Sequence, residues 1–404
     1  MSANNASGTN ANQPSDADRS KLPKRSSSRA GIYALVVVVV IVVVVLAYGA
    51  SAGWLSPKKS SGTCPGGSGQ TVQAAGSTLV QPLMTLWSTQ YTCGQLNYNS
   101  VGSGAGVTSL TQKTVDIGAS DAPLSSTQVS ALPSGATVLT IPEVVAGVAI
   151  IYNNGLAKGL NLSGTVLAGI YLGNVKTWND PAIAALNPGA KLPSANITVV
   201  ERADSSGTTF VYTSWLSLEN STWKSKVGAA TTVNWPTGIK APGSLGVAGD
   251  VKTNPDSVGY VDLAYAITNG LAYAAVQNPA NAYILPNETN TAAAAANFPQ
   301  SNLPAANAEA GWSSVSLLNQ GGATTYPIAT FSYLMVYSDL GAVYGGSETQ
   351  AHAQGVVAFL WWAVTTGQSY DVGLSYVPLP ADVVTFDEAT IASVLYNGHS
   401  LTSH

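Results

Sequence analysis

Arg202 is the side chain whose type and position point most directly to chemistry, because it is the only arginine after the hydrophobic segment near the N-terminus. It ends an apolar strand pattern, and residues 204–208 (Asp-Ser-Ser-Gly-Thr) form a turn typical of a helix start. A planar guanidinium beside free helix N–H groups can grip an oxyanion. We therefore predict a tetrahedral-oxyanion site, with local pairing of Arg202 to Glu201 or Asp204 as the structural alternative.

Two earlier segments share this local design, in which a strand pattern ends, a turn of small residues follows, and a helix pattern begins. They are residues 76–79 (Gly-Ser-Thr-Leu) and residues 102–106 (Gly-Ser-Gly-Ala-Gly). Glycine lets a ligand approach the backbone closely, and a helix start leaves N–H groups unpaired. Each turn alone is equally consistent with an ordinary helix cap. Three such turns in a chain with one exterior arginine favour a ligand site.

Asp121 follows the strand pattern at residues 115–120 and precedes a turn. Its structural alternative is to cap that turn or the next helix. A carboxylate suits an anion site only when the anion carries a proton. Phosphate keeps a proton near neutral pH and sulfate does not, so an ionised Asp121 would accept a hydrogen bond from phosphate and repel sulfate.

The elements that must position these residues are short β-branched runs alternating with helical patterns, which is typical of an α/β fold. Apolar residues recur on one helical face within residues 79–91 and 210–218, and residues 356–365 indicate a buried helix. We expect strands at residues 72–74, 96–100, 115–120, 144–152, 197–200 and 328–337.

Composition limits the possible partners of the protein. Charged residues make up only 9% of the 404-residue chain, against roughly a quarter in ordinary soluble proteins. After residue 50 there are 11 Lys and Arg against 18 Asp and Glu, a formal charge of −7. The electrostatic field of a net negative domain does not attract nucleic acid or an anionic membrane surface. Donors for an anion must therefore be local.

Residues 32–50 form an unbroken, valine-rich apolar run that is long enough to span a bilayer. Basic residues precede it, so the positive-inside rule places the N-terminus in the cytoplasm. We expect a disordered cytoplasmic tail at 1–30, a transmembrane anchor at 31–50 and a stalk at 51–70. A cleaved signal peptide ending near residues 50–52 is the alternative.

The chain has two cysteines, Cys64 and Cys93, and both follow the hydrophobic run. An even pair outside the cell predicts a disulfide that ties the stalk to the first domain, with two free thiols as the alternative. The three histidines show no metal-ligand spacing, so no metal and no cofactor are expected.

Taken together, these motifs resemble the phosphate-binding subunit of the high-affinity phosphate ABC importer, a solute-binding protein. The resemblance extends over about residues 73–384, with an aliphatic Leu79 where the family often has an aromatic residue. Its landmarks are residues 75–78, 101–106, 115–125, 170–173, 178–180, 202–210, 235–238, 259–261 and 326–328.

The resemblance implies a two-domain periplasmic-binding-protein-like fold (type II) whose domains close on phosphate. Domain I would comprise residues 71–149 and 327–404, domain II residues 150–326, and crossovers near 144–152 and 326–337 would form the hinge. Asp204 would orient Arg202, and Asp121 would accept from protonated phosphate. The implied ligand residues are Thr78, Leu79 (by its N–H), Ser103, Asp121, Arg202, Ser206, Gly207 and Thr208.

The same resemblance implies an extracellular, monomeric binding protein that serves ABC permease subunits and is not an enzyme. The alternatives are a surface phosphatase on this scaffold, a binder of arsenate or sulfate, and a phosphate sensor with no transporter. Hydrolysis would need an activated nucleophile, and Ser206 does not lie in a nucleophile-elbow sequence.

Overall fold

The computed structural model of the protein describes residues 68–309 and 311–401. The predicted tail (1–30), the predicted anchor (31–50), Cys64 and the stalk up to residue 67 lie outside these residues. Within the described ranges, no helix combines the length and the apolar character needed to cross a bilayer.

One large mixed sheet organises the chain, with strand order β2-β1-β3-β12-β4-β8-β6-β7 and the short β9 paired to β4. Strands β2, β1 and β3 are parallel to one another, as are β8, β6 and β7, whereas the central strands β12 and β4 pair antiparallel with their neighbours. Its strands are β1 (Thr71–Gly76), β2 (Gln95–Ser100), β3 (Ile117–Ser120), β4 (Val138–Asn153), β6 (Thr198–Arg202), β7 (Ile239–Ala241), β8 (Ser257–Asp262), β9 (Ala272–Tyr273) and β12 (Ala329–Tyr337).

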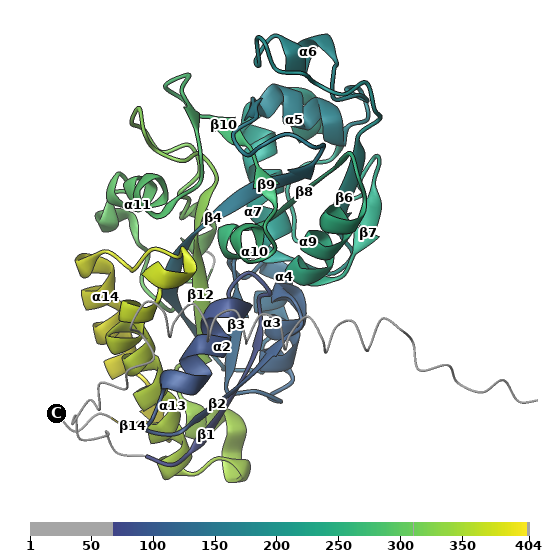
Figure 1. Ribbon diagram of the computed structural model, residues 1–404. Coiled ribbons are helices and arrows are strands. Elements are labelled where there is room, and N and C mark those ends of the chain that lie inside the picture. Colours follow the sequence, from purple (N-terminus) through teal and green to yellow (C-terminus); the bar gives the residue numbers. More distant parts are fainter. Residues whose placement is uncertain (1–67, 310, 402–404) are drawn as a thin grey trace, which may run out of the picture. The chain divides into compact units, whose positions relative to one another are not determined.

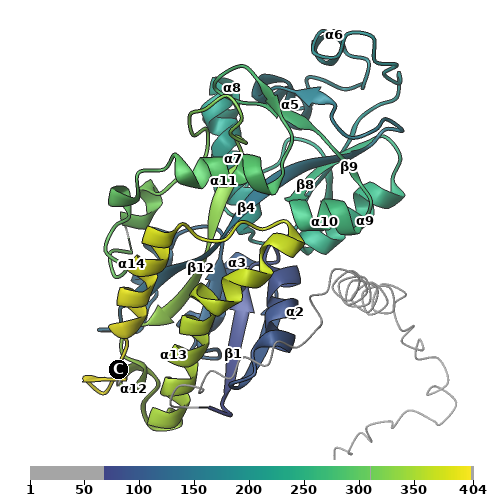
Figure 2. The ribbon, with the colours of Figure 1, turned by 60° about the vertical axis from the view of Figure 1, so that its left-hand side comes forward.

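The molecule has two lobes, seen at the bottom and top of Figure 1. The first lobe contains β1, β2 and β3 with α2 (Gln81–Gln90), α3 (Ser103–Thr111), α13 (Gln350–Val364) and α14 (Ala381–Ala392). The second lobe contains β6, β7 and β8 with α5 (Gly164–Tyr171), α7 (Gly207–Glu219), α9 (Gly243–Thr253) and α10 (Leu263–Thr268). Turned by 60°, Figure 2 shows α13 and α2 on either side of β1.

The remaining elements are short, and several of them lie at the periphery of the two lobes. A small second sheet has the order β11-β10-β5. The strands are β5 (Asn161–Leu162), β10 (Ala275–Gln277), β11 (Tyr283–Ile284), β13 (Leu395–Tyr396) and β14 (His399–Ser400), and the helices are α4 (Ser126–Ser130), α6 (Pro181–Ala184), α8 (Ser221–Lys226), α11 (Glu288–Ala296), α12 (Leu340–Tyr344), η2 (Gln300–Asn302), η3 (Gly311–Ser314), η4 (Gly345–Ser347), η5 (Thr366–Tyr370) and η6 (Val372–Leu374).

Strand β4 joins the two lobes. Residues 138–147 pair antiparallel with β12, and residues 148–153 pair with β8. All of its residues except Asn153 are buried, as expected for a near-continuous apolar run covered on both faces. The lobes therefore share one uninterrupted strand, and β12 lies beside its first part.

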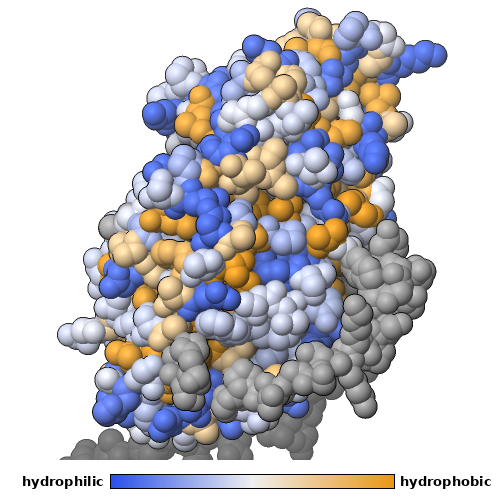
Figure 3. Space-filling view, turned by 90° about the vertical axis from the view of Figure 1, so that its left-hand side faces the viewer, coloured by the Kyte–Doolittle hydropathy of each residue, from blue (hydrophilic) through white to orange (hydrophobic). Residues whose placement is uncertain are grey.

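The six predicted strands are all present, which confirms the predicted α/β fold. The prediction for the fourth strand was too short, because it began at residue 144 whereas β4 begins at Val138. Leu83, Leu86 and Trp87 of α2 face the core, as their helical spacing indicates. On the face shown in Figure 3, hydrophobic residues form small groups among polar ones.

Candidate anion-binding site

Turns at the carboxyl ends of strands from both lobes meet in one place. In the first lobe these turns connect β1 to α2 and β2 to α3, and in the second they connect β6 to α7 and β7 to α9. Ser103 Oγ accepts a hydrogen bond from the Gly207 amide at 3.0 Å, and the Gly104 amide donates to the Ser205 carbonyl at 3.0 Å. The three turns singled out in the sequence therefore converge, at the sheet edge where open α/β folds bind ligands.

Arg202 ends β6 and is almost wholly buried, with a side chain 1% exposed. Its Nε donates to Asp204 Oδ1 at 2.8 Å, its Nη2 donates to the other oxygen of that carboxylate, and its Nη1 lies 3.4 Å from Ser244 Oγ. Burial would raise the pKa of the Asp204 carboxyl, but the hydrogen bonds and charge of Arg202 hold that pKa below its usual value. Asp204 thus fixes the orientation of the guanidinium.

Asp121 lies directly after β3 and is 2% exposed. Three hydroxyls donate to its carboxylate: Ser77 at 2.5 Å, Ser332 at 3.1 Å and Thr208 at 3.2 Å. Burial raises the pKa of this carboxyl, and the hydroxyl bonds and Arg202 oppose that rise. All four opposing groups favour the ionised form, which can accept a further hydrogen bond.

The remaining predicted ligand residues supply hydroxyl and amide groups. Ser206 caps α7 by accepting from the Thr209 amide at 3.1 Å, which leaves its own hydrogen available. The Leu79 amide donates to Ser77 Oγ at 3.0 Å, and the Gly207 amide is bonded to Ser103. These amides already have acceptors within the protein, so an anion would have to share or replace those contacts.

Thr78 contacts a segment that the sequence analysis missed. Its Oγ1 lies 2.9 Å from Ser244 Oγ and accepts from the Ser244 amide at 3.1 Å. The amide of Gly243 donates to Asp204 Oδ1 at 2.9 Å. A strand followed by Pro242, Gly243 and Ser244 at a helix start repeats the Gly/Ser design of the other turns, and this repetition could have identified the segment.

Comparison with known proteins decides the family. A model described as the PBP superfamily domain matches residues 61–365. Phosphate-binding protein PstS of Haemophilus influenzae is 38% identical over 331 residues, which cover 80% of this chain and 93% of that protein. PstS of Xylella fastidiosa is 36% identical over 327 residues, covering 80% and 85%. This chain belongs to the PstS family of phosphate-binding proteins.

Solved structures support the fold expected for the PstS family. A high-affinity periplasmic phosphate-binding protein (PfluDING) with bound phosphate matches with a TM-score of 0.62 at 22% identity, covering 82% of this chain and 96% of that one. The phosphate-binding protein from Stenotrophomonas maltophilia matches with a TM-score of 0.60 at 21% identity, covering 80% and 93%. The predicted two-domain binding-protein fold is thus confirmed. The relatives named PstS are binding proteins rather than enzymes, in agreement with the prediction that this chain is not an enzyme.

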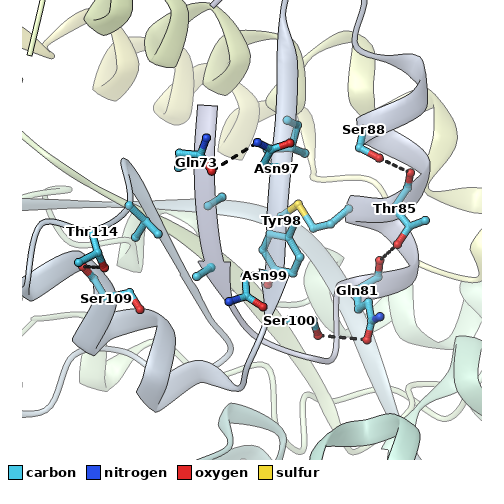
Figure 4. Close-up of a pocket in the computed structure, with 15 residues that line it drawn as sticks. Gln73, Gln81, Thr85, Ser88, Asn97, Tyr98, Asn99, Ser100, Ser109 and Thr114 are labelled. Atoms are coloured by element: carbon cyan, nitrogen blue, oxygen red, sulfur yellow. Dashed lines mark hydrogen bonds between the residues drawn. The ribbon is translucent and has the colours of Figure 1, made fainter. Parts of the chain in front are cut away.

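Two cavities lie near the turns. One of about 360 Å³ is lined by residues of both lobes, including Thr78, Asp204 and Gly243. A larger cavity of about 760 Å³ lies over β1 and β2 in the first lobe. Figure 4 shows Asn97, Tyr98 and other polar side chains of this larger cavity, none of which is a predicted ligand residue.

One group among the described residues could hold a metal ion, although no metal was predicted. Ligand atoms of Asp116, Glu348 and His352 all lie within 4.8 Å of one another, and His352 Nε2 is 3.0 Å from Asp116 Oδ1. The hydrogen bond that the imidazole of His352 donates to Asp116 raises the pKa of His352, so an ion pair explains the arrangement without a metal. Of the predicted disulfide, Cys93 is disulfide-bonded, and Cys64 lies outside the described ranges.

Proposed function

We propose that this protein captures inorganic phosphate between its two lobes, outside the cytoplasm, and delivers it to the permease subunits of an ABC transporter. One observation carries the proposal. Arg202 from the second lobe and Asp121 from the first lobe are both buried where the helix starts converge, surrounded by hydroxyl and amide donors. The names of the PstS relatives support the same ligand.

The roles of the ligand residues follow from their chemistry. Arg202, oriented by Asp204, supplies the positive charge, and its planar fork suits two oxygens of a tetrahedral anion. The Gly207 amide lies at the N-terminus of α7, where the helix dipole also favours an anion. Neutral donors complete the proposed shell: Thr78, the Leu79 amide, Ser103, Ser206 and Thr208.

Asp121 gives the site its selectivity in this proposal. An ionised carboxylate accepts a hydrogen bond from the proton that phosphate carries near neutral pH. Sulfate has no such proton, so its oxygen atoms would face a negative carboxylate at a buried position. A site with one acceptor among many donors therefore distinguishes two anions of almost equal shape.

We further propose the arrangement of the whole chain. Residues 31–50 would anchor it in the membrane, since their apolar run has the length of a spanning helix. Residues 71–149 and 327–404 would form domain I and residues 150–326 domain II, with β4 and β12 as the hinge. This division is supported by the shift of β4 from pairing with β12 to pairing with β8 at residues 147 and 148.

Calorimetric titration of the purified chain with phosphate and with sulfate tests this function. We expect tight phosphate binding and negligible sulfate binding in the same buffer. Comparable binding of both anions would overturn the role given to Asp121, and no phosphate binding would overturn the function itself.

A further inference from the structure

Glu143 is a wholly buried carboxyl that the proposed binding scheme does not use. Ser332 pairs with Val144 in the β4–β12 ladder and Tyr333 pairs with Pro142, so Glu143 is the extra residue of a β-bulge. Bulges turn a side chain in a direction that the regular ladder would not allow. Here the bulge directs the carboxyl of Glu143 toward Ser332, whose Oγ lies 2.8 Å from Glu143 Oε1.

Ser332 stands between two carboxyls. Besides Glu143 Oε1, its Oγ lies 3.1 Å from Asp121 Oδ1. A serine hydroxyl has only one hydrogen to donate. If both carboxyls were ionised, one of these two contacts would join oxygen atoms with no hydrogen between them. A proton on one of the two carboxyls would supply the missing hydrogen and satisfy both contacts.

The surroundings place that proton on Glu143. Asp121 receives hydroxyl bonds from Ser77 and Thr208 and feels the charge of Arg202, all of which favour its ionised form. Glu143 Oε2 has no hydrogen-bond partner. Burial, together with the charge of Asp121, raises the pKa of the Glu143 carboxyl to about 8 against the opposing Ser332 bond.

The other titratable groups around this pair give Glu143 no compensating positive charge. Asp371 is fully buried and interacts with Glu143, and both carboxyl oxygens of Asp371 lack a hydrogen-bond partner. Arg202 is the cation that acts on Asp121. The acidic groups that interact with Glu143 or Asp121 are Tyr98 on β2, Asp262 at the end of β8, Tyr265 on α10, Tyr333 on β12, Asp371 after η5, and Tyr376.

We propose that Glu143 is a positioning residue of the phosphate site: its protonated carboxyl donates to Ser332, which obliges Ser332 to donate its only hydrogen to Asp121. Asp121 is thereby kept an ionised acceptor for the proton of phosphate. This inference rests on the proposed function, and it adds a residue that never touches the ligand.

The proposal has a definite pH dependence. When pH rises through the Glu143 pKa, the ionised Glu143 competes for the Ser332 hydrogen and adds a second negative charge near Asp121. Both changes disfavour the complex, because the added charge repels the anionic phosphate and Asp121 loses the hydroxyl that holds its carboxylate in position. Phosphate binding should weaken in the wild type, whereas Glu143→Gln keeps a neutral donor at every pH.

The test is calorimetric titration with inorganic phosphate from about pH 6 to about pH 9.5, a range that brackets the relevant titration. Wild type and Glu143→Gln are compared at each pH, so that the titration of phosphate itself cancels. We expect the ratio of their dissociation constants to stay constant below pH 7 and to rise about tenfold in favour of Glu143→Gln above the Glu143 pKa. Identical pH profiles would overturn the proposal.

Ser332→Ala provides the matched control, because it removes the link and leaves both carboxyls. In that background, adding Glu143→Gln should change the pH profile less than it does in wild type, because only the direct effect of the Glu143 charge remains, and an undiminished change would overturn the relay through Ser332. Carbon-13 NMR of glutamate-labelled protein without ligand reads the proton directly, with the Glu143 signal assigned by its loss in Glu143→Gln. A Glu143 signal typical of an ionised carboxylate at neutral pH would refute the proposal, whether or not the wild type binds phosphate. Absence of phosphate binding by the wild type would refute the proposed function instead.

Discussion

The hydroxyl of Ser103 accepts a hydrogen bond from the amide of Gly207, which joins the start of α3 in the first lobe to the start of α7 in the second. Thr208 adds a second contact by donating to Asp121 at 3.2 Å. The lobes therefore meet directly at the helix starts that would surround the anion. Because the lobes are this close, we expect a side chain that is larger by one carbon atom at the junction to weaken binding.

Gly207→Ala should weaken phosphate binding by at least about tenfold, because the lobes could no longer approach fully. A β-carbon at this position would lie 2.6 Å from Ser103 Oγ and 2.7 Å from the Asp121 backbone nitrogen. Calorimetric titration measures the loss. Gly249→Ala is the control, since a β-carbon on that α9 glycine meets nothing within 4 Å. Equal affinities for the two variants would argue against a lobe contact that controls binding.

Arg202→Ala should reduce phosphate affinity by more than about a hundredfold, since a buried charged donor to the anion is lost. The control, Lys176→Ala, removes the same charge from an exposed position of the second lobe. Its affinity should remain within about twofold of wild type at moderate salt. If both variants lost affinity equally, a general field rather than a specific contact would explain binding.

Asp121→Asn should change which anion binds. The amide removes the negative charge and can donate to an unprotonated oxygen, so phosphate should bind more weakly and sulfate more tightly. We expect the phosphate-to-sulfate preference to fall by about a hundredfold or more. Parallel calorimetric titrations give this ratio. An unchanged ratio would show that Asp121 does not discriminate.

Asp204→Asn should alter the acid stability of the protein. The pKa of Asp204 lies below its ordinary 3.8, so its ionised form stabilises the fold above that pH and the contribution is lost as pH falls through the lowered value. Thermal unfolding should show wild type more stable than the variant by about 1 kcal/mol near neutral pH. The difference in stability between the two proteins should disappear in strong acid. A difference that did not depend on pH would contradict the lowered pKa of Asp204.

Glu143→Gln should gain stability relative to wild type as pH rises. The pKa of Glu143 is raised from 4.5 to about 8, so the folded state retains a proton that the unfolded chain releases above pH 4.5. The stability that this proton contributes is full below pH 4.5 and declines until about pH 8, by roughly a few kcal/mol. Unfolding of both proteins across this range measures the divergence. If the stability of the two proteins changed with pH in parallel, Glu143 would not titrate in this range.

The sequence singled out residues that the structure brings together, but it did not indicate most of the contacts among them. Arg202, Asp121 and the Gly/Ser turns stood out because a rare cation and helix-start patterns are local features. Pairing of Arg202 with Asp204, offered as the structural alternative, is present and leaves the guanidinium at the junction. Arg202 can therefore pair with Asp204 and also lie in the proposed site.

Contacts between distant residues were not visible in the sequence. Ser332 lies 211 positions after Asp121 and is brought to it by β12 pairing with β3, which no local pattern indicates. Glu143 stands in an apolar run, where a single acidic residue gave no sign of a bulge. Ser244 was missed for a different reason, because its Pro-Gly-Ser turn follows only a three-residue strand.

The strand shared by both lobes has a consequence for how the protein unfolds. Since β4 contributes ten residues to one lobe and six to the other, neither lobe can lose its part of the sheet without exposing an edge of its neighbour. The described residues should therefore melt in a single cooperative calorimetric transition, even though the proposed binding would close one lobe on the other. A destabilising substitution in the core of either lobe would then lower the unfolding free energy of both lobes together.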